Sequence, residues 1–241
     1  MLTLVSFPGA LGEPSLSGFC TKAMICLDMA GQDWRPRFTV DPSNAPYGKL
    51  PVLETPEGPV ADSNLILRWL EAQGADLFPG LDAAGRAQAH ALIRMAEENL
   101  RYGMMYDRWV DPRGWAAFMP VVFGDMPAPL RLVIPGKVRK DIVKGLKWQG
   151  LGRMSPDARQ ACFDADLDAL TDLLWGRHWV MGDTPTAADA AILPVLSGID
   201  SGQADTALRR ALRSRPTLME YVERGRARLY APLTASLCAA A

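Results

Sequence analysis

The chain has 241 residues, 49% of them apolar, which is sufficient for two small domains with buried cores. Its formal net charge of −1 provides no overall field for nucleic acid, so we expect no nucleic-acid partner. The four cysteines lack the spacing of a disulfide framework or a zinc site, which indicates a reducing, cytoplasmic compartment and no bound metal.

The N-terminal third of the chain alternates between β-rich and helical patterns. The predicted elements are a strand at 2–7, a helix at 18–30, a strand at 35–40, a hairpin around the turn at 55–58, and a helix that begins at Asp62 or Ser63. The order is therefore β-α-β followed by β-β-α. This order predicts a mixed α/β domain over residues 1–76.

The rest of the chain carries helical patterns only, which predicts an all-helical domain over residues 83–241. The predicted helices span 83–109, 155–176, 186–196 and 216–229, whereas the Pro- and Gly-rich region 111–135 gives no clear prediction. Thr186 and Asp189 have the spacing of a capping box at the start of one of these helices, and we assign them a structural role. The most apolar stretch, 187–199, is shorter than a membrane span, so we expect no integral membrane segment.

Ser17 stands where the first predicted helix begins. The free N–H groups and partial positive charge of a helix N-terminus stabilise anions such as a thiolate. A serine hydroxyl at this place cannot exchange disulfides, but it can donate a hydrogen bond to an external thiolate and lower that thiol's pKa. A second interpretation, in which Ser17 is only the N-cap of the helix, stays open.

Two further segments have the residue types of a peptide-binding site. Lys49, Leu50 and Pro51 precede a strand; a cis bond before Pro51 would turn the Leu50 backbone towards an extended peptide ligand, and Lys49 would hold a carboxylate. Asp62 and Ser63 precede a helix and suit the ammonium and carboxylate groups of an amino-acid end. Each segment also has a plainer interpretation, as a turn or as a capping pair.

The helical half contains two less specific features. The first is a Met- and aromatic-rich stripe that consists of Met104, Met105, Tyr106 and Trp109. These residues either line a pocket for an apolar substrate or pack in the core. The basic run from Lys137 to Arg153 has one acid, Asp141, against six cations. A solvated helical face is the favoured interpretation of this run, and contact with a membrane surface or an acidic partner is the alternative.

The order of these motifs resembles the glutathione S-transferase superfamily over nearly the whole chain. The resemblance rests on Ser17-x-x-Cys20, on Lys-Leu-Pro-Val-Leu at 49–53, on Ala-Asp-Ser-Asn at 61–64, and on Gly-Asp-x-Pro-Thr-x-Ala-Asp at 182–189. Residues 16–22, 60–66 and 150–155 look most like the failed-axon-connections and metaxin-like branch. That branch usually has Pro where this chain has Gly18, a change that we expect to loosen the start of the helix.

The resemblance implies a thioredoxin-like N-terminal domain, an all-helical C-terminal domain and a homodimer. It also implies glutathione as co-substrate, with its thiol activated by Ser17. The Leu50 backbone before a cis Pro51 would pair with the cysteinyl unit of glutathione. Asp62 and Ser63 would hold the γ-glutamyl end, and Lys49 would hold the glycyl carboxylate. The thiolate would then attack a small hydrophobic electrophile in a detoxification reaction.

Two other functions remain open at this point. In the first, the fold is retained without catalysis, as in a binding or interaction protein of the metaxin-like type. In the second, Cys20 serves a glutathione-dependent reductase, although Cys20 lies a turn inside the helix, where side chains are usually packed.

Overall fold

A four-stranded mixed sheet forms the base of the N-terminal domain in the computed structural model, which describes residues 1–234. The strands are β1 (Leu2–Ser6), β2 (Trp34–Phe38), β3 (Val52–Thr55) and β4 (Gly58–Ala61), in the order β2-β1-β3-β4. β1 runs parallel to β2 and antiparallel to β3, and β3 and β4 form the expected hairpin. Cys238 and the end of the expected helical domain lie outside the described residues.

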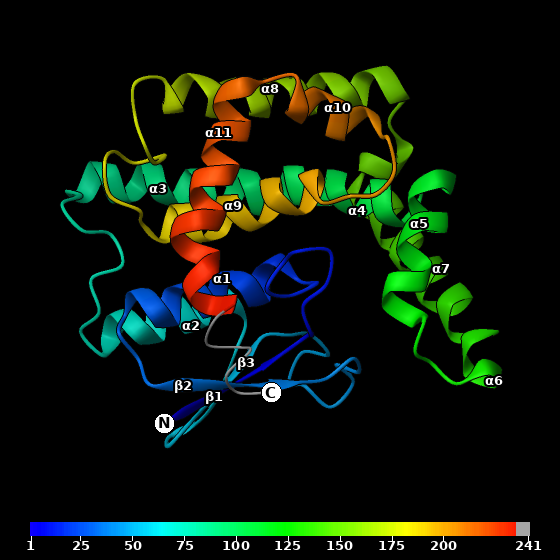
Figure 1. Cartoon of the computed structure of the whole chain (residues 1–241), viewed down its shortest axis with the longest axis horizontal. Helices are drawn as coiled ribbons and strands as arrows, with labels where there is room; N and C mark the ends of the chain where they lie inside the picture. The colour runs from blue at the N-terminus through cyan, green and yellow to red at the C-terminus, as the bar shows by residue number, and fades with distance from the viewer. Residues whose placement is uncertain (235–241) are drawn as a thin grey trace.

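Two helices, α1 (Gly18–Met29) and α2 (Ser63–Ala72), cover one face of this sheet (Figure 1). Leu4 of β1 and Leu53 of β3, which face each other across the strands, are fully buried together with Ile66 of α2. The opposite face is covered by the irregular segment 39–50 and not by a helix. The sheet and its helices together form the predicted thioredoxin-like domain.

The second part of the chain is helical. Its elements are α3 (Ala83–Met95), η1 (Ala96–Leu100), α4 (Arg101–Trp109), α5 (Pro112–Phe123), α6 (Ala128–Arg131), α7 (Ile134–Gln149), η2 (Leu151–Arg153), α8 (Pro156–Leu174), α9 (Ala187–Asp200), α10 (Ala207–Arg213), α11 (Pro216–Gly225) and η3 (Arg226–Tyr230). The single helix expected over 83–109 is continuous, but η1 is a π-helical turn within it. Such turns are frequent at functional sites, because they redirect the side chains that follow.

Helix α9 is the centre of the molecule, and every one of its residues is buried. It packs on α1 of the first domain and on α3, α4 and α11 of the second. In Figure 1, α1 lies below α9, α3 and α4 lie at its level, and α11 crosses it. The expected capping box is present: Thr186 N–H donates to Asp189 Oδ2, and Thr186 Oγ1 accepts from the Ala188 N–H. Ala187 N–H also donates to Leu77 O, which ties the interdomain linker to the start of α9.

Helices α5, α6 and α7 form an arm at one end of the helical domain. Figure 1 shows them in green, extending away from the layered helices. The base of the arm is fixed to α4, where Trp109 contacts the rings of Trp115, Phe118 and Phe123. Within residues 1–234, no helix combines the length and the apolar character needed to cross a bilayer.

Candidate functional site

Ser17 is the N-cap of α1, at the end of the loop that follows β1. Its Oγ accepts from the Cys20 N–H at 3.4 Å, a long hydrogen bond, and its own N–H donates to Ser15 Oγ. The Gly18 and Phe19 N–H groups make no hydrogen bond with any residue of 1–234. Helix α1 therefore begins with an available hydroxyl and two free donors, despite Gly18, and this arrangement suits an anion.

The Leu50–Pro51 peptide bond is cis and lies beside this helix start. Leu50 packs with Val5, Cys20, Val52 and Ala61 in one small apolar cluster. The backbone N–H and C=O of Leu50 make no hydrogen bond within the described chain. An extended ligand thus finds a free backbone donor and acceptor next to Ser17.

The start of α2 is joined to the same place, because the Asp62 N–H donates to Pro51 O at 3.2 Å. Asp62 has φ 85°, a left-handed backbone that favours glycine, and its Oδ1 caps α2 by accepting from the Asn64 N–H at 2.8 Å. Ser63 is 1% exposed, and its Oγ finds no hydrogen-bond partner among residues 1–234. A buried hydroxyl without a partner costs free energy unless a ligand supplies one.

Lys49 is exposed and forms no ion pair within residues 1–234, so its ammonium is available to a ligand. Cys20, in contrast, is fully buried, and burial raises the pKa of its thiol. A thiol in that environment is protonated at neutral pH and weakly reactive. The structure therefore offers little to the reductase interpretation.

A buried ion pair lies directly beneath these groups, and the sequence did not single it out. Lys22 Nζ of α1 donates to Glu97 Oε1 in η1 at 2.6 Å and to Asn64 Oδ1 of α2 at 2.7 Å. Asn64 in turn donates to Glu97 Oε2. Three elements that carry or support the candidate site are thus held together across the domain boundary.

The four residues of the Met- and aromatic-rich stripe separate in the structure. Met104 borders a cavity, Met105 contacts Arg101, Tyr106 lies under Arg159, and Trp109 belongs to the aromatic cluster of the arm. Only Met104 therefore lines the cavity described next.

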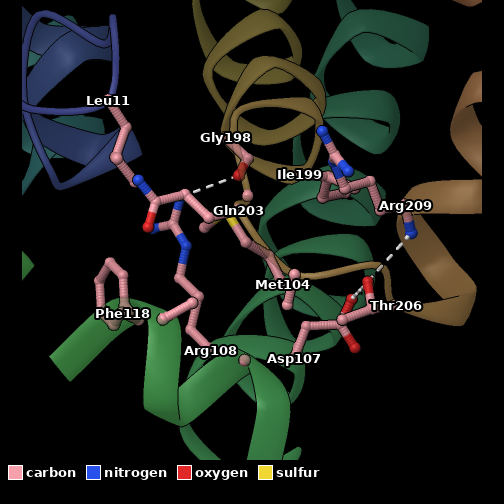
Figure 2. Close-up of a pocket in the computed structure, with 14 residues that line it drawn as sticks. Leu11, Met104, Asp107, Arg108, Phe118, Gly198, Ile199, Gln203, Thr206 and Arg209 are labelled. Carbon is pink, nitrogen blue, oxygen red and sulfur yellow. Dashed lines mark hydrogen bonds between the residues drawn. The ribbon is translucent and has the colours of Figure 1, made fainter.

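This cavity, of about 30 Å³, lies between the loop before α1, the C-terminal end of α4, α5 and α9. Figure 2 shows the Arg108 side chain reaching from α4 towards Gly198, with Leu11 on one side and Thr206 on the other. Arg108 Nη2 donates to Gly198 O at 2.8 Å, and its guanidinium lies over the Phe118 ring. The volume is enough for about one water molecule.

Two charged groups of this cavity have shifted pKa values. Burial lowers the pKa of Arg108 to about 10, and burial raises the pKa of Asp107 to about 6, although Thr206 donates a hydrogen bond to the Asp107 carboxylate. Shifts of this kind are typical of functional sites. Leu11, which lines the cavity, has φ 58°, and Asp62 at the start of α2 is the other non-glycine residue with a positive φ among residues 1–234.

A buried polar network anchors the loop that carries Leu11 and Ser17. Glu13 accepts hydrogen bonds from Ser197 of α9 and from Arg226 of η3, and Arg226 also pairs with Asp200 at 2.8 Å. This network fixes the position of the loop relative to both α9 and the cavity.

A larger groove, of about 430 Å³, lies on the outer face of the sheet beneath the segment 39–50. Leu50 borders this groove, together with Val5, Val52, Arg37 and Glu54. No group of three or more His, Cys, Asp or Glu side chains with the arrangement of a metal site occurs within the described part of the chain.

Comparison with known proteins agrees with this architecture. Residues 18–114 match the family described as the glutathione S-transferase N-terminal domain, and residues 163–225 match the glutathione S-transferase C-terminal domain. An isoprene-epoxide–glutathione S-transferase of Rhodococcus sp. (strain AD45) is 32% identical, over 93% of this chain and 97% of that protein. The Failed axon connections protein of Drosophila melanogaster is 28% identical over 88% of this chain, which spans about half of that protein (54%).

Solved structures show the same fold at lower identity. A glutathione S-transferase from Rhodospirillum rubrum is 21% identical, covers 97% of this chain and 91% of its own, and has a TM-score of 0.62. Both family models match the chain, and the Rhodococcus relative is 32% identical over 93% of this chain. The chain therefore belongs to the glutathione S-transferase superfamily.

Proposed function

We propose that the protein is a glutathione S-transferase that conjugates glutathione to a small, oxygen-bearing hydrophobic electrophile, such as an epoxide, and so detoxifies it. The observation that carries the proposal is the convergence of three groups at one end of the sheet. These are the Ser17 hydroxyl at the start of α1, the Leu50 backbone, and the Ser63 hydroxyl at the start of α2, of which the last two find no hydrogen-bond partner among residues 1–234.

In this proposal glutathione lies in extended form along the N-terminal domain. Its cysteinyl unit pairs with the Leu50 backbone, and Ser63 with the free N–H groups of α2 receives the γ-glutamyl carboxylate. Asp62 faces the γ-glutamyl ammonium, and Lys49 faces the glycyl carboxylate. The thiol then lies at the start of α1, where the Ser17 hydroxyl donates to its sulfur.

The reaction forms a carbon–sulfur bond and breaks a carbon–oxygen bond of the epoxide. The oxygen gains negative charge as the ring opens and then takes a proton from water. The Arg108 guanidinium faces a cavity of one-water size, so we place the epoxide oxygen there and the hydrocarbon part outside, between Leu11 and Phe118. Hydrogen-bond donors aimed at developing charge are a large source of catalysis.

The test is the steady-state rate of conjugation of glutathione with a terminal epoxide. Replacement of Ser17 by Ala should lower kcat/KM by roughly 10²-fold, because a donor to the reacting atom is lost. Ser17→Thr keeps a hydroxyl and should retain most of the activity. Equal activity in wild type and Ser17→Ala would remove Ser17 from the mechanism.

A non-catalytic binding or interaction protein of the metaxin-like type is the alternative, and the similarity to the Failed axon connections protein supports it. Glutathione binding measured by calorimetry, without conjugation of any of several epoxides, halides and nitroaromatics, would support this alternative. From the family we also propose a homodimer and a cytoplasmic location. Analytical ultracentrifugation tests the first, and cell fractionation tests the second.

A further inference from the structure

Helix α7 carries a row of lysines on its outer face. Lys137, Lys140, Lys144 and Lys147 are exposed, and their spacing of three and four residues places them on one side of the helix. None of them forms an ion pair with another residue of the described chain. We call this row, with Trp148 at its end, the α7 outer face.

The opposite face of α7 holds the helix in a fixed orientation. Leu146 is buried there, and Arg139 donates to Trp109 O at 2.8 Å while its guanidinium lies over the Trp115 ring. The lysines therefore point away from the protein because the inner face is packed on α4 and α5.

Large apolar side chains lie at both ends of the row. Leu132 is 86% exposed and Val133 is 66% exposed just before α7, and Trp148 is 78% exposed near its end. A single exposed apolar side chain is ordinary on a protein surface, but these three stand at the two ends of one lysine row, where they can act together with it. Lysines together with Trp and Leu are the residue types that membrane-surface segments present to lipid headgroups.

The arm is also separate from the parts of the chain that match the family. Most of α5 and all of α6 and α7 lie between the two matched regions, 18–114 and 163–225. Figure 1 shows the arm extending beyond the layered helices, where a flat surface can reach it.

We propose that the α7 outer face binds the surface of a bilayer that contains anionic phospholipids. The lysines complement the lipid phosphates and carboxylates, and each lysine near such a surface contributes to binding. Leu132, Val133 and Trp148 enter the boundary between headgroups and acyl chains. The helix has 16 residues, so it lies along about 24 Å of this surface.

The apolar residues decide between a bilayer and other polyanions. A nucleic acid would pair with the lysines, but its phosphate backbone would leave Leu132 and Val133 in water. An isologous contact with a second copy would bring the lysine rows together and repel. A bilayer uses the charged and the apolar residues at once.

The experiment is flotation of the full-length protein with vesicles of phosphatidylcholine alone or with about 30% phosphatidylserine. Wild type should bind only the anionic vesicles, and binding should fall as salt rises from about 0.15 M to about 0.5 M. The double variant Lys140→Glu/Lys144→Glu should bind at least about tenfold more weakly. The matched control, Arg177→Glu/Arg228→Glu, changes the net charge equally on exposed residues elsewhere and should bind as wild type does.

A second double variant tests the exposed apolar residues before α7. Leu132→Ser/Val133→Ser should weaken vesicle binding severalfold but leave glutathione conjugation unchanged, because the arm tip lies outside the candidate site. Absence of binding to anionic vesicles by wild type would overturn the proposal. An equal loss of vesicle binding in the arginine control would also overturn it. So would a result in which the lysine variants change only nucleic-acid binding or the oligomeric state.

Discussion

The ammonium of Lys22 and the carboxylate of Glu97 lie 2.6 Å apart, 1% and 2% exposed, on opposite sides of the domain boundary. Lys22 belongs to α1, which Ser17 caps, and Glu97 belongs to the π-helical turn of the helical domain. Asn64 of α2 bonds to both. The pair therefore joins the helix starts of the proposed glutathione site to the second domain.

Loss of one partner should be far more damaging than loss of both. Lys22→Met removes the closer cation of the buried Glu97 and leaves it only Arg94, at 3.5 Å, so it should lower the free energy of unfolding by about 3 kcal/mol. The double variant Lys22→Met/Glu97→Leu should recover at least about 2 kcal/mol of this loss. Urea unfolding of wild type, Lys22→Met, Glu97→Leu and the double variant measures the coupling, and additive effects would contradict a direct interaction.

Substitution of Ser63 should separate stability from function. Its Oγ is buried and finds no hydrogen-bond partner in the described part of the chain, so Ser63→Ala should leave the free energy of unfolding unchanged or raise it by about 1 kcal/mol. The same change should raise the KM for glutathione about tenfold, because the carboxylate loses a donor.

Thr21 provides the matched control for Ser63. Its Oγ1 is also buried and finds no partner within residues 1–234, but we place no ligand against it. Thr21→Val should therefore stabilise the fold to a similar extent and leave the KM for glutathione unchanged. A rise in KM for both variants would mean that the Ser63 effect is indirect.

Arg108 should matter most for substrates that release charge onto oxygen. Arg108→Met should lower kcat with an epoxide by roughly 10²-fold, but kcat with an alkyl halide much less, since halide leaves without an oxygen at the cavity. Arg159→Met is the control, because Arg159 lies over Tyr106 outside the cavity. Equal losses on both substrate classes would assign Arg108 a structural role, which circular dichroism can confirm.

Asp107 should make stability depend on pH in an identifiable direction. Burial raises its pKa from 3.8 to about 6, so the folded state holds a proton that the unfolded state releases between these values. The free energy of unfolding should therefore fall by about 2–3 kcal/mol as pH rises from about 4 to about 6. A smaller part of the fall should follow between about pH 6 and about pH 7, because half of the folded molecules still hold this proton at pH 6.

The Asp107→Asn variant isolates that contribution. It keeps an acceptor for Thr206 but does not titrate, so the wild-type minus variant difference should follow the predicted slope. Unfolding in urea at several pH values provides the comparison. A difference that is constant from about pH 4 to about pH 7 would contradict the assignment.

The sequence predicts the order of the elements because it depends on local signals. Turn residues, helix caps and apolar periodicity lie within a few positions of one another, as in the capping box of Thr186 and Asp189. The glutathione S-transferase architecture was therefore predicted and is confirmed. The roles of Ser17, Lys49, Leu50, Pro51, Asp62 and Ser63 stay predictions.

The residues that the sequence did not reveal depend on long-range partners. Lys22 has the pattern of any helical lysine, and its partner Glu97 is 75 positions away. Asp107 and Arg108 stand between Tyr106 and Trp109 of the Met- and aromatic-rich stripe, but the stripe is recognised by its apolar residues and so does not include them. One local signal does point to these two residues: they are adjacent charged residues among large apolar ones near the end of the predicted helix 83–109. Helices α5 and α6 lie in the region 111–135 that gives no clear prediction, and α10 has no counterpart among the predicted helices.

The central claim is that Ser17 stabilises the thiolate of bound glutathione, and the pKa of that thiol tests it most directly. The thiolate absorbance of bound glutathione, followed against pH, measures this value in wild type and in Ser17→Ala. We predict a thiol pKa in the wild-type complex lower than that of free glutathione by about 1–3 units, with most of the shift lost in the variant. An identical thiol pKa in the two complexes would contradict the account.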